Sequence, residues 1–268
     1  MTSLATTSPS EAGSAYSGVS AVIRDSVTMS KRNLRLIRRT PQLLGFSSAL
    51  PISFTLLFFY VFGGAVRIPG QTYIDYLIPT MLVLSPLFGA TTAIAMAVDM
   101  TGGMIERFRS LPIARSAVLG GRTVADLARS TVVIAIVLVI GLLLGFRFHN
   151  AFLPCLAALG LVLAFSFAMS WAMAWIGMTL KDPQAASVAA FLPIFLMTFA
   201  GAGIVPVHTL PGWLQAFANV QPISVTIDAV RVLTQGGPVF HPLWQSLAWI
   251  AGILIVFMPL AVHEYRKV

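Results

Sequence analysis

The sequence is poor in charged residues, in cysteine and in histidine, and each shortage excludes a class of site. Asp, Glu, Lys and Arg together make up 10% of the 268 residues, whereas roughly a quarter is usual in a soluble domain. Cys155 is the single cysteine, which excludes an internal disulfide and a cysteine-based metal cluster. The four histidines, at positions 149, 208, 241 and 263, have no metal-ligand spacing. We therefore expect no metal site in this chain.

The sequence also lacks a nucleotide-binding motif and a recognisable set of catalytic residues. The phosphate-binding pattern G-x-x-x-x-G-K-[ST] is absent, and the dipeptide Gly-Lys occurs nowhere in the chain. No combination of Ser, His and an acidic residue indicates a hydrolase. We predict that the chain is not an enzyme and holds no cofactor, so that any ATP it depends on binds to another subunit.

Apolar residues are abundant and make up 57% of the chain. Six apolar segments are each long enough to cross a hydrocarbon core of about 30 Å at about 1.5 Å per residue. They cover residues 43–62, 76–98, 125–146, 151–179, 185–205 and 243–262. The sequence therefore predicts an all-α polytopic membrane protein with six transmembrane helices.

The distribution of positive charge predicts the direction in which these helices cross the membrane. With the N-terminus in the cytosol, all but three of the 17 Lys and Arg residues lie on the cytosolic side of the membrane. The three on the outer side are Arg67, Arg147 and Arg231. Because the cytosolic loops of membrane proteins carry the excess of Lys and Arg, we predict that both termini are cytosolic. This placement accounts for the net charge of +8 without a nucleic-acid partner.

The region before the first span divides into two parts. Residues 1–18 are rich in Ser, Thr, Ala and Gly and have no basic region or apolar run, so we expect a disordered cytosolic tail rather than a signal peptide. Residues 19–40 interleave apolar positions with basic ones. This pattern is typical of an amphipathic helix in the cytosolic interface, with its arginines on anionic lipid. A soluble basic helix that only sets the topology is the alternative.

The most polar interruption of the apolar pattern is the segment 100–122, between the second and third spans. Residues 104–110 form a helix-compatible run that follows Gly102-Gly103 and stops before Pro112, which cannot continue a helix. Apolar and charged side chains fall on different faces of this short rod: Ile105, Phe108 and Leu111 on one, and Glu106, Arg107 and Arg109 on the others. We interpret the rod as a docking element for a cytosolic partner; an ordinary charged loop is the alternative.

A second unusual region, residues 206–242, precedes the sixth span. It is fairly apolar but is interrupted by prolines and by Gly236-Gly237, and it is too short for two further crossings. We predict short helices at residues 212–219 and 223–234 that lie on the outer leaflet or re-enter it, backed by protein. A plain extracellular loop is the alternative.

The inner half of the fourth span contains a candidate substrate surface made of Met169, Trp171, Met173 and Trp175. Methionine and aromatic side chains adapt to apolar ligands of irregular shape. Packing within the bundle or against lipid is the alternative interpretation of these four residues. No span carries an unambiguous charge at mid-depth, so proton-coupled transport lacks its usual carrier.

Two motifs, together with the layout of six spans, an interfacial helix and an apolar outer segment, make the chain resemble the membrane subunit of type-2 ABC exporters. The resemblance is to the daunorubicin-resistance-like branch in particular. Residues 103–115 (GMIERFRSLPIAR), followed by Gly121-Arg122, are similar to the cytosolic coupling segment of that family. Residues 219–231 (NVQPISVTIDAVR) are similar to its Asn-Pro…Arg signature before the last span, with Gln221 where the family usually has Asn.

The resemblance implies a function and a set of partners. Two permeases, identical or homologous, would pair in the plasma (inner) membrane of a bacterium. They would sit on two copies of an ATPase subunit, which would bind ATP and Mg²⁺. The implied coupling residues are Gly103, Glu106, Arg107, Phe108, Arg109 and Pro112, and the implied outer signature residues are Gln221, Pro222, Asp228 and Arg231.

The activity that this resemblance implies is the export of a drug, a lipid or a lipid-linked metabolite. The apolar spans favour an amphipathic cargo over a sugar or a free amino acid. A secondary carrier or channel that needs no ATPase is the alternative, and a membrane enzyme of lipid metabolism is a third hypothesis.

Overall fold

The computed structural model describes residues 41–66, 68, 70–88, 91–101, 115–201, 203, 207 and 210–267. The helices of these ranges are α3 (Pro41–Phe62), α4 (Tyr73–Leu84), α5 (Thr91–Thr101), α7 (Arg115–Leu143), α8 (Phe152–Leu180), α9 (Pro183–Phe199), α10 (Gly212–Ala218), α11 (Pro222–Gln235) and α12 (Phe240–Lys267). No strand is present in the same ranges, so the predicted all-helical class is confirmed. The predicted tail and interfacial helix, residues 1–40, lie outside the described part of the chain.

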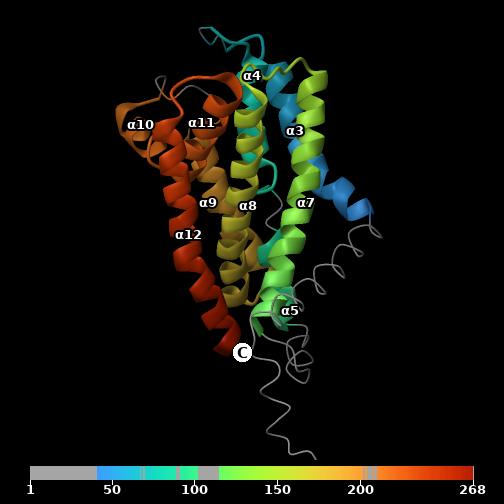
Figure 1. The fold of residues 1–268 in the computed structure, drawn as a ribbon. Helices are drawn as coiled ribbons and strands as arrows, with labels where there is room; N and C mark the ends of the chain where they lie inside the picture. The colour runs from blue at the N-terminus through green and yellow to red at the C-terminus, as the bar shows by residue number, and fades with distance from the viewer. Residues whose placement is uncertain are drawn as a thin grey trace, which may run out of the picture.

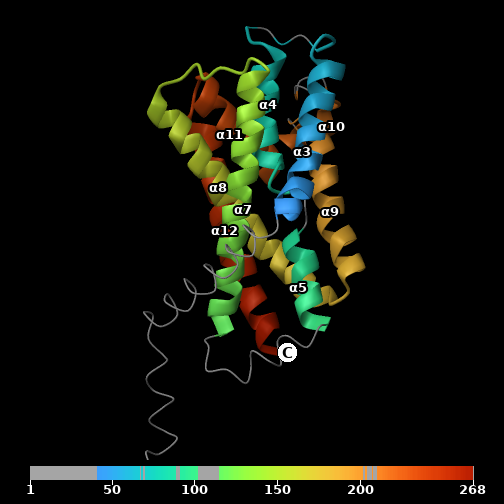
Figure 2. The ribbon, with the colours of Figure 1, turned by 90° about the vertical axis from the view of Figure 1, so that its right-hand side faces the viewer.

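The long helices stand side by side around α8, which is the central helix of the bundle (Figure 1). α8 packs against α5, α7, α9, α11 and α12. The short helices α10 and α11 lie at the end of the bundle opposite the C-terminus, and α5 lies at the end that carries the C-terminus (Figures 1 and 2). The bundle therefore has two distinct ends joined by α8.

Within the described ranges, three helices contain apolar stretches long enough to cross a membrane. These stretches are Arg122–Leu143 of α7, Phe152–Leu180 of α8 and Phe240–Tyr265 of α12. The other apolar helical stretches are shorter: Ser48–Phe62, Tyr73–Leu84, Thr92–Thr101 and Pro183–Phe199. The chain is therefore an integral membrane protein, and the number of six crossings remains a prediction.

The outer faces of the bundle are apolar as well as its core. Leu143 and Phe152 are 82% and 80% exposed, and Phe240 and Ile255 are 86% and 73% exposed. Exposed apolar side chains of this size are costly in water and are expected where helices face lipid tails. These surfaces support the assignment of α7, α8 and α12 to the membrane.

The second predicted span, residues 76–98, is not one helix, which corrects that expectation. α4 ends at Leu84 and α5 begins at Thr91. Pro86 has no N–H group for the carbonyl of Leu82, and the Ser85 hydroxyl donates to that carbonyl instead, at 3.4 Å. The two halves have different neighbours: α4 packs against α3, α7, α8 and α11, and α5 packs against α8 and α9.

The turn between α8 and α9 follows from three consecutive residues. Lys181 adopts a left-handed conformation (φ 57°) that ends α8, and its N–H donates to the carbonyl of Gly177. Asp182 then accepts a hydrogen bond from the backbone N–H of Ala185 at 2.8 Å, and Pro183 occupies the first turn of α9. A carboxylate at the N-cap followed by proline is a strong helix start.

The connection between α7 and α8 is tied to two neighbouring helices. The backbone N–H of Arg147 donates to Asp75 of α4 at 3.2 Å. His149 Nδ1 lies 2.7 Å from the amide oxygen of Gln235, and the Asn150 amide donates to the carbonyl of Leu233 at 3.1 Å. These contacts hold the last turn of α11 beside the start of α4.

Candidate functional site

The outer signature begins at Gln221, which is 3% exposed and directly precedes α11. Its amide nitrogen donates to the carbonyl of Met197 on α9 at 2.7 Å and to the Ser224 hydroxyl at 2.5 Å. Gly201 leaves room for this amide, since a Cβ at that position would lie 2.2 Å from Gln221 Nε2. The amide therefore ties the start of α11 to the end of α9.

Pro222 is the first residue of α11 and supports a second attachment. Its fixed φ suits the first turn of a helix. Its carbonyl accepts a hydrogen bond from the Thr226 hydroxyl at 2.7 Å, and that hydroxyl lies 3.0 Å from Ser246 of α12. The N-terminal halves of α11 and α12 are joined through these hydroxyl groups.

The signature ends at Arg231, whose side chain is 13% exposed. Its guanidinium lies 3.7 Å from the ring centroid of Tyr76 and forms a 2.6 Å ion pair with Asp228, one turn earlier on α11. Arg231 Nη2 also donates to the Thr80 hydroxyl at 3.3 Å, and that hydroxyl donates to the carbonyl of Gly203 at 2.7 Å. The signature residues therefore form a joint between α4, α9 and α11.

The predicted coupling residues Gly103, Glu106, Arg107, Phe108, Arg109 and Pro112 lie outside the described residues. The structure does describe both flanks of their segment. Asp99, near the end of α5, forms an ion pair with Arg122 of α7, and both side chains are partly exposed. This ion pair joins the two ends of segment 100–122.

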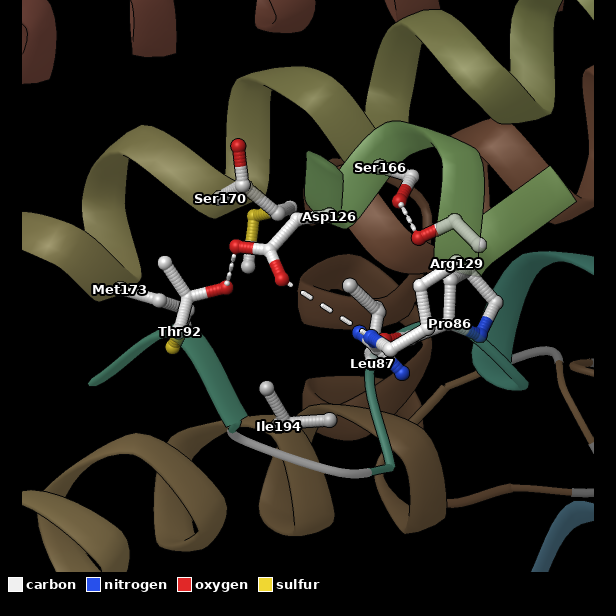
Figure 3. A pocket seen from close by; sticks show the side chains of 11 residues that line it. Pro86, Leu87, Thr92, Asp126, Arg129, Ser166, Ser170, Met173 and Ile194 are labelled. Carbon is white, nitrogen blue, oxygen red and sulfur yellow. Dashed lines mark hydrogen bonds and ion pairs between the residues drawn. The ribbon is translucent and has the colours of Figure 1, made fainter. Parts of the chain in front are cut away.

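A polar cavity lies where the second span is broken (Figure 3). The Thr92 hydroxyl of α5 donates to Asp126 of α7 at 2.6 Å. Arg129 Nη2 donates to the carbonyl of Pro86 at 3.5 Å, so one helical turn of α7 contacts both sides of the break. The remaining lining residues are Leu87, Ser130, Ser166, Met169, Ser170, Met173 and Ile194.

Asp126 and Arg129 lie near the start of the apolar stretch of α7, and the sequence analysis gave them no role. The available signal was the spacing of opposite charges at positions i and i+3 within an apolar helix. The facing Ser130 and Ser166 hydroxyls, 2.9 Å apart, come from α7 and α8 and had no sequence signal that joined them.

The four residues of the predicted substrate surface lie on two sides of α8. Met169 and Met173 line the polar cavity. Trp171 is 3% exposed and packs in an apolar cluster with residues of α5 and α12, and the Trp175 ring lies 5.6 Å from that of Phe257 on α12. The four side chains do not form one continuous surface, and their contact with substrate remains a prediction.

The described residues offer no group of three or more His, Cys, Asp or Glu side chains that could hold a metal ion. The polar groups of the cavity and of the outer signature are hydroxyls, the Gln221 amide, carbonyls and the Asp126–Arg129 and Asp228–Arg231 pairs. Such groups join helices and hold water. Both polar sites therefore lie at positions where one helix of the bundle meets another.

Comparison with known proteins identifies the family. Residues 25–234 match the ABC-2 type transporter family. The chain is 32% identical over 219 residues to the daunorubicin resistance ABC transporter permease protein of Streptomyces coeruleorubidus, which covers 81% of this chain and 77% of the relative. It is 29% identical over 224 residues to a probable doxorubicin resistance ABC transporter permease protein of Mycobacterium tuberculosis. The aligned residues cover 81% of this chain and 79% of that relative.

A doxorubicin resistance permease of Mycobacterium tuberculosis is 27% identical over 204 residues, which cover 72% of this chain and 70% of that protein. The family match includes both the coupling segment and the outer signature. The resemblance seen in the two motifs is thus confirmed. The chain belongs to the ABC-2 type transporter family and is a type-2 ABC permease, the membrane subunit of a transporter.

Proposed function

We propose that this chain forms the translocation path of an ATP-driven exporter for a hydrophobic or amphipathic substrate, such as a drug, a lipid or a lipid-linked metabolite. The observation that carries the proposal is the family match over residues 25–234. Relatives whose names state daunorubicin or doxorubicin resistance support an apolar or amphipathic cargo. The chain supplies the path, and hydrolysis of ATP takes place on a partner.

The partner is a separate ABC ATPase, present in two copies, which binds ATP and Mg²⁺. A second permease, identical or homologous, completes the path in the bacterial plasma membrane. Lys181 directly follows α8, and Lys267 is the last residue of α12. These two lysines support a cytosolic position for the end of the bundle that carries the C-terminus. The six spans and the interfacial helix of residues 19–40, in contact with anionic lipid, belong to the same proposal.

The coupling residues Gly103, Glu106, Arg107, Phe108, Arg109 and Pro112 contact the ATPase in this proposal. The Asp99–Arg122 ion pair supports it, because it joins α5 to α7 at the base of the segment. A displacement of the segment by the ATPase would then move α5 and the adjoining turns of α7 together. Because α4 ends at Leu84 and α5 begins at Thr91, the two halves of the second span need not move as one rigid helix.

At the opposite end, residues 206–242 lie at the outer leaflet or re-enter it and form part of the exit. Gln221 and Arg231 hold α11 against α9 and α4, which supports the role of α11 as protein-backed helix rather than free loop. Pro222 lies at the start of α11, and Asp228 neutralises the charge of Arg231 in the same helix.

The test is purification of the tagged chain from its own host in mild detergent, followed by an assay for ATPase that co-purifies. We expect ATPase with the wild-type chain and its loss from the double variant Glu106→Lys, Arg107→Glu. The matched control is Arg147→Glu, a charge reversal on an exposed residue at the opposite end of the bundle, which should retain the ATPase. ATPase retained by the double variant would refute the proposed contact.

The alternative function is a secondary carrier or channel that works without an ATPase. One observation favours it: Asp126 and Arg129 place ionisable groups beside a cavity inside the bundle, as proton-coupled carriers do. Transport into vesicles that contain no ATP, driven by a proton gradient alone, would establish this alternative. Transport that requires ATP and the partner would exclude it.

A further inference from the structure

The cavity at the break in the second span has room for water. Its volume is about 20 Å³, and about 10–15 Å³ is enough to hold one water molecule. Its lining includes hydroxyl and charged side chains of α5, α7 and α8, together with the methionines of α8 and Ile194 of α9 (Figure 3). A polar cavity of this size is suited to water, whereas an apolar one would stay dry.

One buried polar atom of this cavity lacks a hydrogen-bond partner in the described part of the chain. Arg129 Nε is buried and has no hydrogen-bond acceptor among the described residues. Asp126 Oδ1 lies 3.8 Å from that nitrogen, which is beyond the range of a direct hydrogen bond. The other oxygen of Asp126 already accepts from Thr92. Across a polar contact longer than about 3.5 Å, a water molecule can join the donor to the acceptor.

The surroundings make an incomplete pair costly. The side chains of Asp126 and Arg129 are 16% and 14% exposed, within the apolar stretch of α7. Removal of a charged group from water costs several kcal/mol for each ion unless hydrogen bonds compensate it. Lipid tails supply no hydrogen bonds, so the compensating groups have to lie inside the bundle.

We propose that this cavity is a water-binding site within the membrane-spanning bundle, in which water bridges Arg129 Nε to Asp126 Oδ1. The bridged pair holds both sides of the break on α7: Arg129 through the carbonyl of Pro86, and Asp126 through the hydroxyl of Thr92. The junction of α4 and α5 is therefore hydrated. This inference concerns the bundle itself and does not depend on the cargo or on the ATPase.

Radiolytic footprinting tests the inference, because hydroxyl radicals formed from bound water oxidise the methionines beside it to sulfoxides. The protein is purified with its native partners, placed in lipid nanodiscs and exposed to X-rays, and oxidation is measured by mass spectrometry. Met173 lines the cavity, whereas Met81 and Met178 are fully buried and do not. We expect several-fold more oxidation at Met173 than at Met81 and Met178. Equal oxidation at all three would overturn the inference.

Two variants at one position separate hydration from other causes of reactivity. Ser170 lines the cavity, and its hydroxyl donates to the carbonyl of Phe167 in its own helix. Ser170→Leu fills the cavity and should lower the oxidation of Met173 to the level of Met178. Ser170→Ala leaves the space open and should retain it. Full oxidation of Met173 in folded Ser170→Leu would refute the water site, and the wild-type comparison decides the matter if that variant does not fold.

Discussion

Gly177 of α8 lies directly against Ala93 of α5: a Cβ at position 177 would come 2.2 Å from the carbonyl oxygen of Ala93. The two helices therefore touch backbone to backbone at this crossing. α5 has 11 residues and is separated from α4 by the break, so this contact is a main attachment of the inner half of the second span.

Substitution of Gly177 by alanine should detach α5 from α8. Overpacking of this kind costs about 1–3 kcal/mol, because backbone atoms cannot move aside as a flexible side chain does. We expect a lower midpoint of thermal unfolding in detergent for Gly177→Ala. The matched control is Gly160→Ala in the same helix, where a Cβ would meet nothing within 4 Å. Equal midpoints for the two variants would contradict the close crossing.

Even a conservative replacement of Arg231 should destabilise the protein. Arg231→Lys keeps the charge but loses the planar group that covers Tyr76 and reaches Asp228 and Thr80 together. We expect a loss of about 1.5–3 kcal/mol in the free energy of unfolding, as for other hydrogen bonds to charged groups. Arg147→Lys, at an exposed position, is the control and should unfold as the wild type does. The joint would be unimportant if the two variants were equally stable.

A negative charge at position 221 should lower the stability of the protein more than truncation of the Gln221 side chain does. Gln221→Ala removes the donor to the Met197 carbonyl at a 3% exposed position, which costs about 1–3 kcal/mol. Gln221→Glu has the same shape but places a carboxylate against that carbonyl, so we expect it to be the less stable of the two. Denaturation of both variants in lipid nanodiscs measures the order. The reverse order would show that the amide does not donate to Met197.

The Asp99–Arg122 ion pair should affect transport more than stability. Because both side chains are partly exposed, the pair contributes less than about 1 kcal/mol to folding. We expect Asp99→Arg and Arg122→Asp each to lower transport, and the double exchange to restore it. The Glu264–Lys267 pair of α12 is the control, and its reversal should leave transport unchanged. A double exchange as inactive as the single variants would exclude a role for the pair itself.

Thr92→Val should weaken the contact between α5 and α7. Valine has the shape of threonine but cannot donate to Asp126, which is left with an unpaired oxygen in an apolar helix. Thr92→Ser keeps the donor and should behave as the wild type does in both thermal stability and transport. If serine and valine variants were indistinguishable, the hydroxyl would have no part in holding α5.

The sequence predicted most helices of the bundle because hydropathy and caps are local signals. Pro86 lies at the break in the second span, but a proline alone does not predict such a break. Pro51, Pro193 and Pro259 lie inside α3, α9 and α12, whereas Pro86 follows the end of α4. Proline is tolerated in membrane helices when neighbours satisfy the freed backbone groups. The neighbours decide the outcome, and they are not visible in a single sequence.

The candidate sites show the same limit. The motif identified Arg231, but its partners Tyr76 and Thr80 lie 155 and 151 residues earlier in the chain. The division of Met169, Trp171, Met173 and Trp175 into two pairs, by contrast, follows from helix geometry, since residues four apart share a face and residues two apart do not. Local spacing could have predicted this division, although the sequence analysis treated the four residues as one surface, whereas the long-range pairing of Arg231 needed the structure.

The divided second span also has a consequence for the biosynthesis of the protein. α4 and α5 have 12 and 11 residues, which gives each a length of about 16–18 Å at 1.5 Å per residue. Each is about half of a 30 Å hydrocarbon core. The helices that cover the break, α7, α8, α9 and α11, leave the ribosome later. We therefore expect a nascent chain cut short before α8 to have no stable place for its second span.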